Sequence, residues 1–277
     1  MTHVTAPDGV RLAYDVTGSG PPLLCLAGLT RNMDDFETVV DAFADRARIV
    51  RMDYRGRGGS DHADPATYTI AQEAQDVLTL LDHLGLGQVT ILGTSRGGLI
   101  AMALAVGAKA RLSGVILNDI GPVIEADGLA VIMDYIGLPP PYATLAEAAA
   151  GLPRAYGTDF TDVPPETWAA FARRLYREEG GALALRYDPR LREAVAPAFA
   201  PGAVAPDLWP WFDALDGLPL GLIRAANSNL LSPETTAEMI RRRPDMVVAE
   251  VPGRGHVPFL DEPPAQSVIA AVLDAVR

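Results

Sequence analysis

The chain has 277 residues, of which 49% are hydrophobic and 21% are charged, and its formal net charge is −12. This composition can bury a large α/β core, and the negative charge argues against nucleic acids and anionic membranes as partners because their phosphates are also negative. The sequence has a single cysteine, Cys25, which lies in an apolar run, and its N-terminus has no secretory signal. It also has no apolar stretch long enough to span a bilayer. These features predict a soluble, cytoplasmic protein.

The first 121 residues alternate between short apolar runs and amphipathic segments. Continuous apolar runs are typical of strands in a buried parallel sheet, and the segments between them have the spacing of helices. The expected elements are a hairpin around residues 8–9, strands at 23–28, 47–53, 89–92 and 114–119, and helices at 33–45, at 69–84 and directly after residue 95. This order predicts an α/β fold in which helices cover both faces of the sheet.

The alternation stops after residue 121 and resumes near residue 215. Residues 122–214 contain helical pieces joined by proline-rich segments, with no clear buried strand, whereas strands at 219–225 and 246–252 and helices after Ser232 and Glu262 follow. We therefore expect an eight-stranded, mostly parallel sheet with helices on both faces. Its core would comprise 1–121 and 215–277, and 122–214 would form a helical cap.

A serine between glycines lies where the strand at 89–92 must turn into a helix. Gly93, Ser95 and Gly97 form the pattern G-x-S-x-G, which is typical of a nucleophile elbow, because the tight turn tolerates only small neighbours and exposes the serine hydroxyl above the sheet. The alternative is a glycine-rich turn with an incidental serine. The pattern by itself does not decide between them.

A serine nucleophile needs a general base, and His256 is the candidate. It follows the last expected strand in the segment "GRGHVPFLDEP", where glycines free the loop. The other histidines are weaker candidates, because His3 is terminal, His62 lies in a polar loop and His83 lies at a helix end.

Three segments together resemble the α/β-hydrolase superfamily, in its cap-bearing branch of bacterial serine hydrolases. They are the turn "GTSRGG", the loop "DYRGRGGSD" and the terminal "GHVPFLDEP". The resemblance covers nearly the whole chain and implies an oxyanion hole made by the backbone amides of Arg96 and Leu29. Ala27 stands where relatives often have histidine, which matters little because the donor is a backbone amide.

The acid of the implied triad is ambiguous. Relatives usually place it in a segment that here reads "RAANSNLLS", so Asn229 occupies the acid position. Either Asp119, after the strand at 114–119, is the acid, or Asn229 marks a lost acid, or the site only binds ligand. The otherwise usual form of the segment favours the lost-acid interpretation. In a serine protease the corresponding change from aspartate to asparagine costs about 10⁴ in kcat.

The resemblance implies a cofactor-independent serine hydrolase for a small carboxylic ester or lactone. The alternatives are a C–C bond hydrolase for ring-cleavage diketones and a non-catalytic ligand-binding protein. Arg31 and Asn32 are candidates to line the pocket mouth, whereas Arg55 and Arg57 are expected to tie down their own loop. The Arg96 side chain is expected to be solvated or ion-paired. No cysteine and histidine spacing predicts a metal, and the oligomeric state stays open.

Overall fold

The computed structural model describes residues 1–199 and 205–276. Within these residues an eight-stranded sheet has the order β1-β2-β4-β3-β5-β6-β9-β10, in which β2 is antiparallel to both of its neighbours and the other pairs are parallel. The strands are β1 (Thr2–Thr5), β2 (Arg11–Thr17), β3 (Pro22–Leu26), β4 (Arg48–Met52), β5 (Val89–Thr94), β6 (Leu112–Asn118), β9 (Leu220–Ala225) and β10 (Val247–Val251). The predicted fold class is confirmed.

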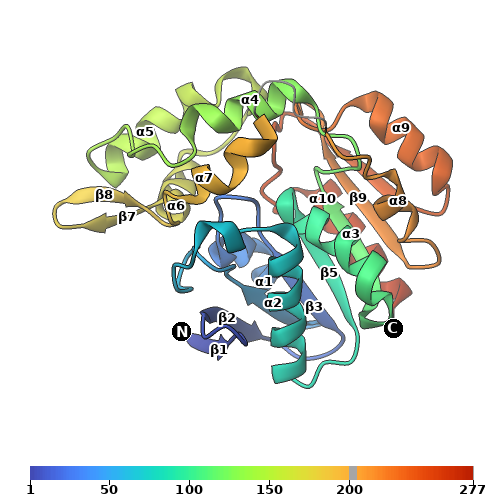
Figure 1. The fold of residues 1–277 in the computed structure, drawn as a ribbon. Helices are drawn as coiled ribbons and strands as arrows, with labels where there is room; N and C mark the ends of the chain where they lie inside the picture. The colour runs from blue at the N-terminus through green and yellow to red at the C-terminus, as the bar shows by residue number, and fades with distance from the viewer. Residues whose placement is uncertain (200–204, 277) are drawn as a thin grey trace.

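Helices cover both faces of the sheet (Figure 1). The helices of this core are α1 (Glu37–Phe43), α2 (Ile70–His83), α3 (Arg96–Ala108), α8 (Trp209–Asp213), α9 (Pro233–Arg242) and α10 (Pro263–Ala275). Successive residues of β3 point to opposite faces: Leu24 and Leu26 pack in the cluster with α2 and α3, whereas Leu23 and Cys25 pack in the cluster with α1 and α10. Burial raises the pKa of the Cys25 thiol, which therefore stays protonated.

The helix ends follow local chemistry that the sequence displays. Thr69 accepts a hydrogen bond from the Gln72 amide at 3.1 Å and so begins α2, which was expected over 69–84. Ser232 accepts from the Thr235 amide at 3.3 Å and begins α9, with Pro233 in its first turn. These caps satisfy backbone donors that have no partner within the helix.

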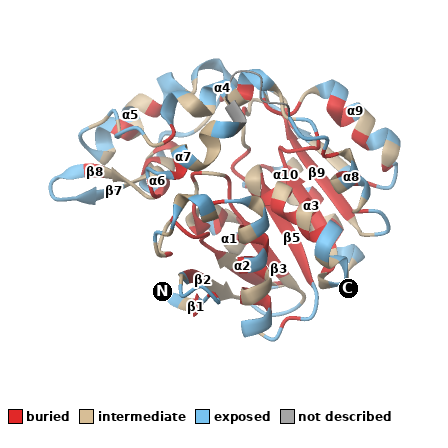
Figure 2. Ribbon diagram, viewed as in Figure 1, coloured by how far each residue is buried: buried red, intermediate tan, exposed pale blue. Residues whose placement is uncertain are grey.

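A segment between β6 and β9 forms a layer over one edge of the sheet (Figure 1). It contains α4 (Ala126–Tyr135), α5 (Leu145–Ala155), α6 (Pro165–Leu175), β7 (Tyr176–Glu179), β8 (Ala182–Leu185) and α7 (Leu191–Val195). We call residues 122–199 the cap. Figure 2 shows that its outer surface, including the β7–β8 hairpin, is largely exposed.

The cap differs from the sequence expectation in two respects. Its β7 and β8 pair as an antiparallel hairpin, so the segment is not wholly helical. The expected boundary at residue 214 is also too late, because α8 packs on the main core, where Phe212 and Leu215 are fully buried. Helix α8 follows the cap in sequence, but it packs against α3 of the core.

One loop of the core, which contains Gly56 and Gly58, pairs with the backbone of the cap. The Gly58 amide donates to the Arg186 carbonyl and the Asp188 amide donates to the Gly56 carbonyl, each at 2.7 Å. The Tyr68 hydroxyl donates to Asp188 Oδ2 at 2.6 Å. Burial opposes ionisation of Asp188, but hydrogen bonds from Arg190 and Tyr68 outweigh it and lower the pKa of this carboxyl to about 2. Asp188 is therefore an anionic anchor between cap and core.

No helix in the described part of the chain is both long enough and apolar enough to cross a bilayer.

Candidate active site

Ser95 lies at the sharp turn between β5 and α3. Its backbone has φ 50° and ψ −114°, a region that residues with side chains rarely adopt. A methyl group at Gly97 would lie 2.1 Å from the Leu26 carbonyl oxygen, and one at Gly93 would lie 2.5 Å from the Gly97 backbone. Both glycines are therefore required by close packing, and they hold the serine in its strained conformation.

His256 reaches Ser95 from the loop between β10 and α10. Its Nε2 lies 3.0 Å from Ser95 Oγ, and its Nδ1 lies 2.7 Å from Asp119 Oδ2. The imidazole is therefore hydrogen-bonded on one side to a hydroxyl and on the other to a carboxylate. This is the arrangement in which a histidine can take a proton from a serine.

Asp119, directly after β6, is the acid that contacts the histidine. It is fully buried, its backbone φ is 53°, and its Oδ1 accepts the Ala225 amide at 2.8 Å. Its Oδ2 also accepts the Ser228 hydroxyl at 2.7 Å. Three donors thus surround the carboxylate and fix its direction.

Asp119, and not Asn229, makes the hydrogen bond to His256 Nδ1, so the favoured interpretation, a lost acid at position 229, is wrong. Asn229 is exposed, and its backbone carbonyl packs against Gly128 of α4. The reason is that β6 and β9 are adjacent and parallel, with Asn118 opposite Ile223, so the segments after both strands start beside each other. Asp119 is the first residue after β6, and its carboxylate points toward His256.

The backbone amides of Leu29 and Arg96 are available as oxyanion donors. Within residues 1–199 and 205–276, no protein group accepts a hydrogen bond from either amide. Gly28 brings the Leu29 loop close to the nucleophile, because a methyl group at Gly28 would lie 3.8 Å from Ser95 Cβ. Two free donors near the nucleophile are what an acyl-transfer site needs.

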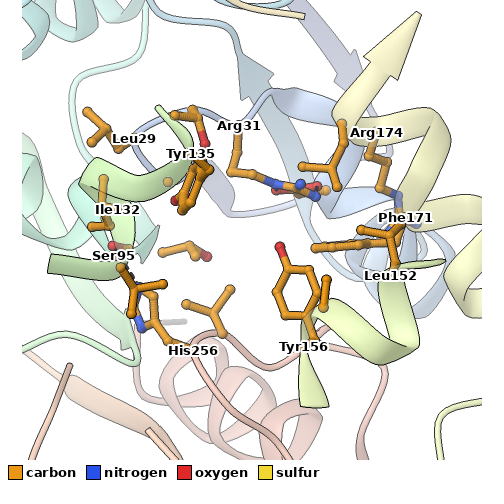
Figure 3. A pocket seen from close by; sticks show the side chains of 18 of the residues that line it. Leu29, Arg31, Ser95, Ile132, Tyr135, Leu152, Tyr156, Phe171, Arg174 and His256 are labelled. Atoms are coloured by element: carbon orange, nitrogen blue, oxygen red, sulfur yellow. Dashed lines mark hydrogen bonds and ion pairs between the residues drawn. The ribbon is translucent and has the colours of Figure 1, made fainter. Parts of the chain in front are cut away.

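A cavity of about 590 Å³ lies between Ser95 and the cap. Figure 3 shows Ser95 and His256 on one side of this space and Arg31, Phe171 and Tyr156 across it. Aromatic side chains form much of its wall, and they are Tyr135, Tyr142, Tyr156, Phe160, Phe171, Tyr176, Tyr187 and Phe259. Burial raises the pKa of Tyr187 to about 12 and that of Tyr156 further, so their hydroxyls are neutral.

Arg31 lines the cavity as expected, but its charge is already paired. Its Nε donates to Asp35 Oδ2 at 2.7 Å, and its guanidinium carbon lies 4.3 Å from the centre of the Phe171 ring. Asn32 does not line the cavity, which corrects the expectation for this residue. Its side chain is buried, donates to the Arg174 carbonyl at 2.8 Å and accepts the Asp34 amide at the start of a short 3-10 helix.

Some residues of the site carry no clear signal in the sequence. Ser228, which holds Asp119, is one of several serines in polar segments. Glu73 on α2 forms ion pairs with Arg57 and Arg96, and only the loop motif around Arg57 hinted at a role for any of these charges. In the described residues, no three His, Cys, Asp or Glu side chains come together as a metal site.

Comparisons with known proteins find similar chains in sequence and in fold. The family described as "alpha/beta hydrolase fold" matches residues 21–263. A 3-hydroxybutyrate-oligomer hydrolase from Cupriavidus necator is 38% identical over 96% of this chain and 93% of its own. A 2-(acetamidomethylene)succinate hydrolase from Mesorhizobium japonicum is 25% identical over 94% of this chain and 89% of its own.

The solved structures include a similar protein as well. An alpha/beta hydrolase from Novosphingobium aromaticivorans has a TM-score of 0.91 and 38% identity, covering 99% of this chain and 97% of its own. The family match, the extended identity and the shared fold identify this chain as a member of the alpha/beta hydrolase family and support a hydrolase activity.

Proposed function

We propose that this hydrolase is a serine esterase that cleaves carboxylic esters through an acyl-enzyme. The observation that carries the proposal is the continuous chain of hydrogen bonds from Ser95 Oγ through His256 to the buried Asp119, at 3.0 and 2.7 Å. A hydroxyl is a weak nucleophile near neutral pH, and a base held in this way activates it.

The residues divide the reaction between them. Ser95 Oγ attacks the ester carbonyl carbon while His256 Nε2 takes its proton, and Asp119 stabilises the imidazolium that forms. The Leu29 and Arg96 amides donate to the oxyanion of the tetrahedral intermediate. His256 then protonates the departing alkoxide, and the alcohol leaves. A water molecule, deprotonated by the same histidine, hydrolyses the acyl-Ser95 ester and releases the acid.

The proposed substrates are esters of short hydroxy acids. The 38% identical relative carries the name 3-hydroxybutyrate-oligomer hydrolase, and its identity extends over the cap as well as the core. The cavity of about 590 Å³ falls in the range of roughly 300–1,000 Å³ that small-molecule sites occupy. Its apolar wall with neutral tyrosine hydroxyls suits a chain of ester carbonyls and methyl groups.

The non-catalytic alternative loses its support, because it depended on Asn229 as the partner of His256 and Asp119 occupies that place. The C–C bond hydrolase alternative has no observation in its favour beyond the shared fold.

A fluorophosphonate probe and a defined ester test the proposal together. The wild-type chain should be labelled at Ser95 and should release 3-hydroxybutyrate from its linear dimer, and Ser95→Ala should do neither. Labelling without dimer hydrolysis, but with hydrolysis of p-nitrophenyl butyrate, would reject the substrate and keep the serine esterase. No labelling and no hydrolysis of either ester would reject the function.

A further inference from the structure

Three charged side chains form a buried network behind the proposed oxyanion hole. Glu73 of α2 is fully buried and lies between two arginines. Its Oε2 accepts Arg96 Nε at 2.5 Å, and its Oε1 lies 2.9 Å from Arg57 Nη1. Arg57 is also fully buried, and Arg96 retains 11% side-chain exposure. Two cations and one anion thus share this interior space.

The network touches both segments that supply oxyanion donors. Arg57 Nε donates to the Leu29 carbonyl at 3.0 Å, so it holds the residue whose amide is the first donor. Arg96 supplies the second donor from its own backbone, and its side chain is held by Glu73 and by the Tyr68 carbonyl at 2.9 Å. A path of polar contacts therefore runs from Leu29 through Arg57 and Glu73 to Arg96.

We propose that Arg57 and Glu73 are positioning residues that set the separation and direction of the two oxyanion donors. This inference rests on the proposed function, because it concerns the oxyanion of that reaction. An oxyanion hole works only when its donors lie about 2.7–3.1 Å from the position where negative charge develops and are held there to within about 0.5 Å. The Leu29 loop and the start of α3 are distant in sequence. Glu73 connects them, because it pairs with Arg57, which holds the Leu29 carbonyl, and with Arg96, which begins α3.

Stability alone is a poor explanation for this network. Removing ions from water carries a desolvation penalty that is of the same order as the attraction they gain in the interior. Replacement of buried ion pairs by apolar side chains is therefore often neutral or stabilising. Arg57 Nη2 also remains buried without a hydrogen-bond partner. A buried charged donor without a partner destabilises the folded state. Correct placement of the two oxyanion donors is a gain in activity that can offset this loss of stability.

The same helix provides a matched control. Asp76 is fully buried on α2 one turn after Glu73, and it pairs with the buried Arg55 at 2.7 Å. Neither Asp76 nor the Arg55 side chain contacts Leu29 or Arg96 in the described contacts. Glu73→Gln and Asp76→Asn therefore both convert a buried, arginine-bound carboxylate to an amide, but only the first change breaks the link to the oxyanion donors.

The test measures kcat, KM and the affinity for a trifluoromethyl ketone ester analogue, whose adduct with Ser95 carries an oxyanion. Glu73→Gln and Arg57→Met should each lower kcat by about 10- to 100-fold, a fraction of the loss from deleting a donor, with little change in KM. The analogue affinity should fall by a similar factor. Asp76→Asn should lower the unfolding midpoint comparably and leave kcat and analogue affinity within about threefold of wild type.

Two results would overturn the inference. One is an equal loss of kcat in Glu73→Gln and Asp76→Asn, which would mean that both changes act through general stability. The other is an unchanged analogue affinity in folded Arg57→Met and Glu73→Gln. A wild-type chain that neither reacts with a fluorophosphonate nor hydrolyses an ester would instead reject the proposed function, and the inference with it.

Discussion

Replacing Asp119 by asparagine is expected to lower kcat by about 10⁴, which corresponds to about 5.5 kcal/mol of transition-state stabilisation. The magnitude is that of the same change in a serine protease, and the surroundings of this carboxylate give the reason to expect it here. Its Oδ1 accepts the Ala225 amide at 2.8 Å, and its Oδ2 accepts His256 Nδ1–H at 2.7 Å. An asparagine has only one acceptor oxygen, so one of these two donors must face its NH₂ group.

The backbone donor decides how the asparagine side chain orients. The Ala225 amide belongs to β9 and cannot turn away, so the amide oxygen is expected to face it and the NH₂ group is expected to face His256. Nδ1 then becomes an acceptor and Nε2 carries the proton. In that tautomer the imidazole cannot accept a proton from Ser95, and no carboxylate stabilises an imidazolium.

The assay is steady-state hydrolysis of p-nitrophenyl butyrate, together with the rate of fluorophosphonate labelling at Ser95. Asn229→Ala is the control, because in the described residues no hydrogen bond joins Asn229 to His256, whose Nδ1 is held by Asp119, and it should leave kcat within about threefold of wild type. Asn229→Asp should likewise give no increase. If Asp119→Asn kept nearly full activity, or if Asn229→Asp raised kcat by powers of ten, the assignment of Asp119 as the acid would be refuted.

Three further changes test other parts of the structure. Asp188→Asn should destabilise the protein by about 2 kcal/mol at pH 7, because the folded state lowers the pKa of this carboxyl to about 2. This stabilisation is lost as pH falls from about 4 to 2, so urea unfolding should give equal free energies of unfolding for the two proteins in acid. Gly97→Ala should abolish activity and destabilise the fold by more than about 3 kcal/mol, since its methyl would lie 2.1 Å from the Leu26 carbonyl oxygen, and a stable, active variant seen by calorimetry would contradict this packing. Asn32→Ala should cost about 1–3 kcal/mol of stability with KM unchanged, and a raised KM at full stability would return Asn32 to the pocket.

Local patterns in the sequence determined the sheet and the nucleophile turn. Strand runs such as 23–26 alternate between two buried faces, which makes them continuously apolar, and the caps at Thr69 and Ser232 act on amides only three residues away. The Ser95 turn is equally local, because its glycines are needed within the turn itself. Features of this kind are readable because cause and effect lie within a few residues.

Contacts between distant segments decided which acid pairs with the histidine. Asp119 and Asn229 follow adjacent strands, and only the backbone turn at Asp119 and the donors from Ala225 and Ser228 determine which side chain meets His256. The sequence by itself thus determined which serine and which histidine form the candidate catalytic pair. The tertiary structure decided which carboxylate completes the hydrogen-bonded chain, because the direction of a side chain depends on partners that the linear sequence does not place beside it.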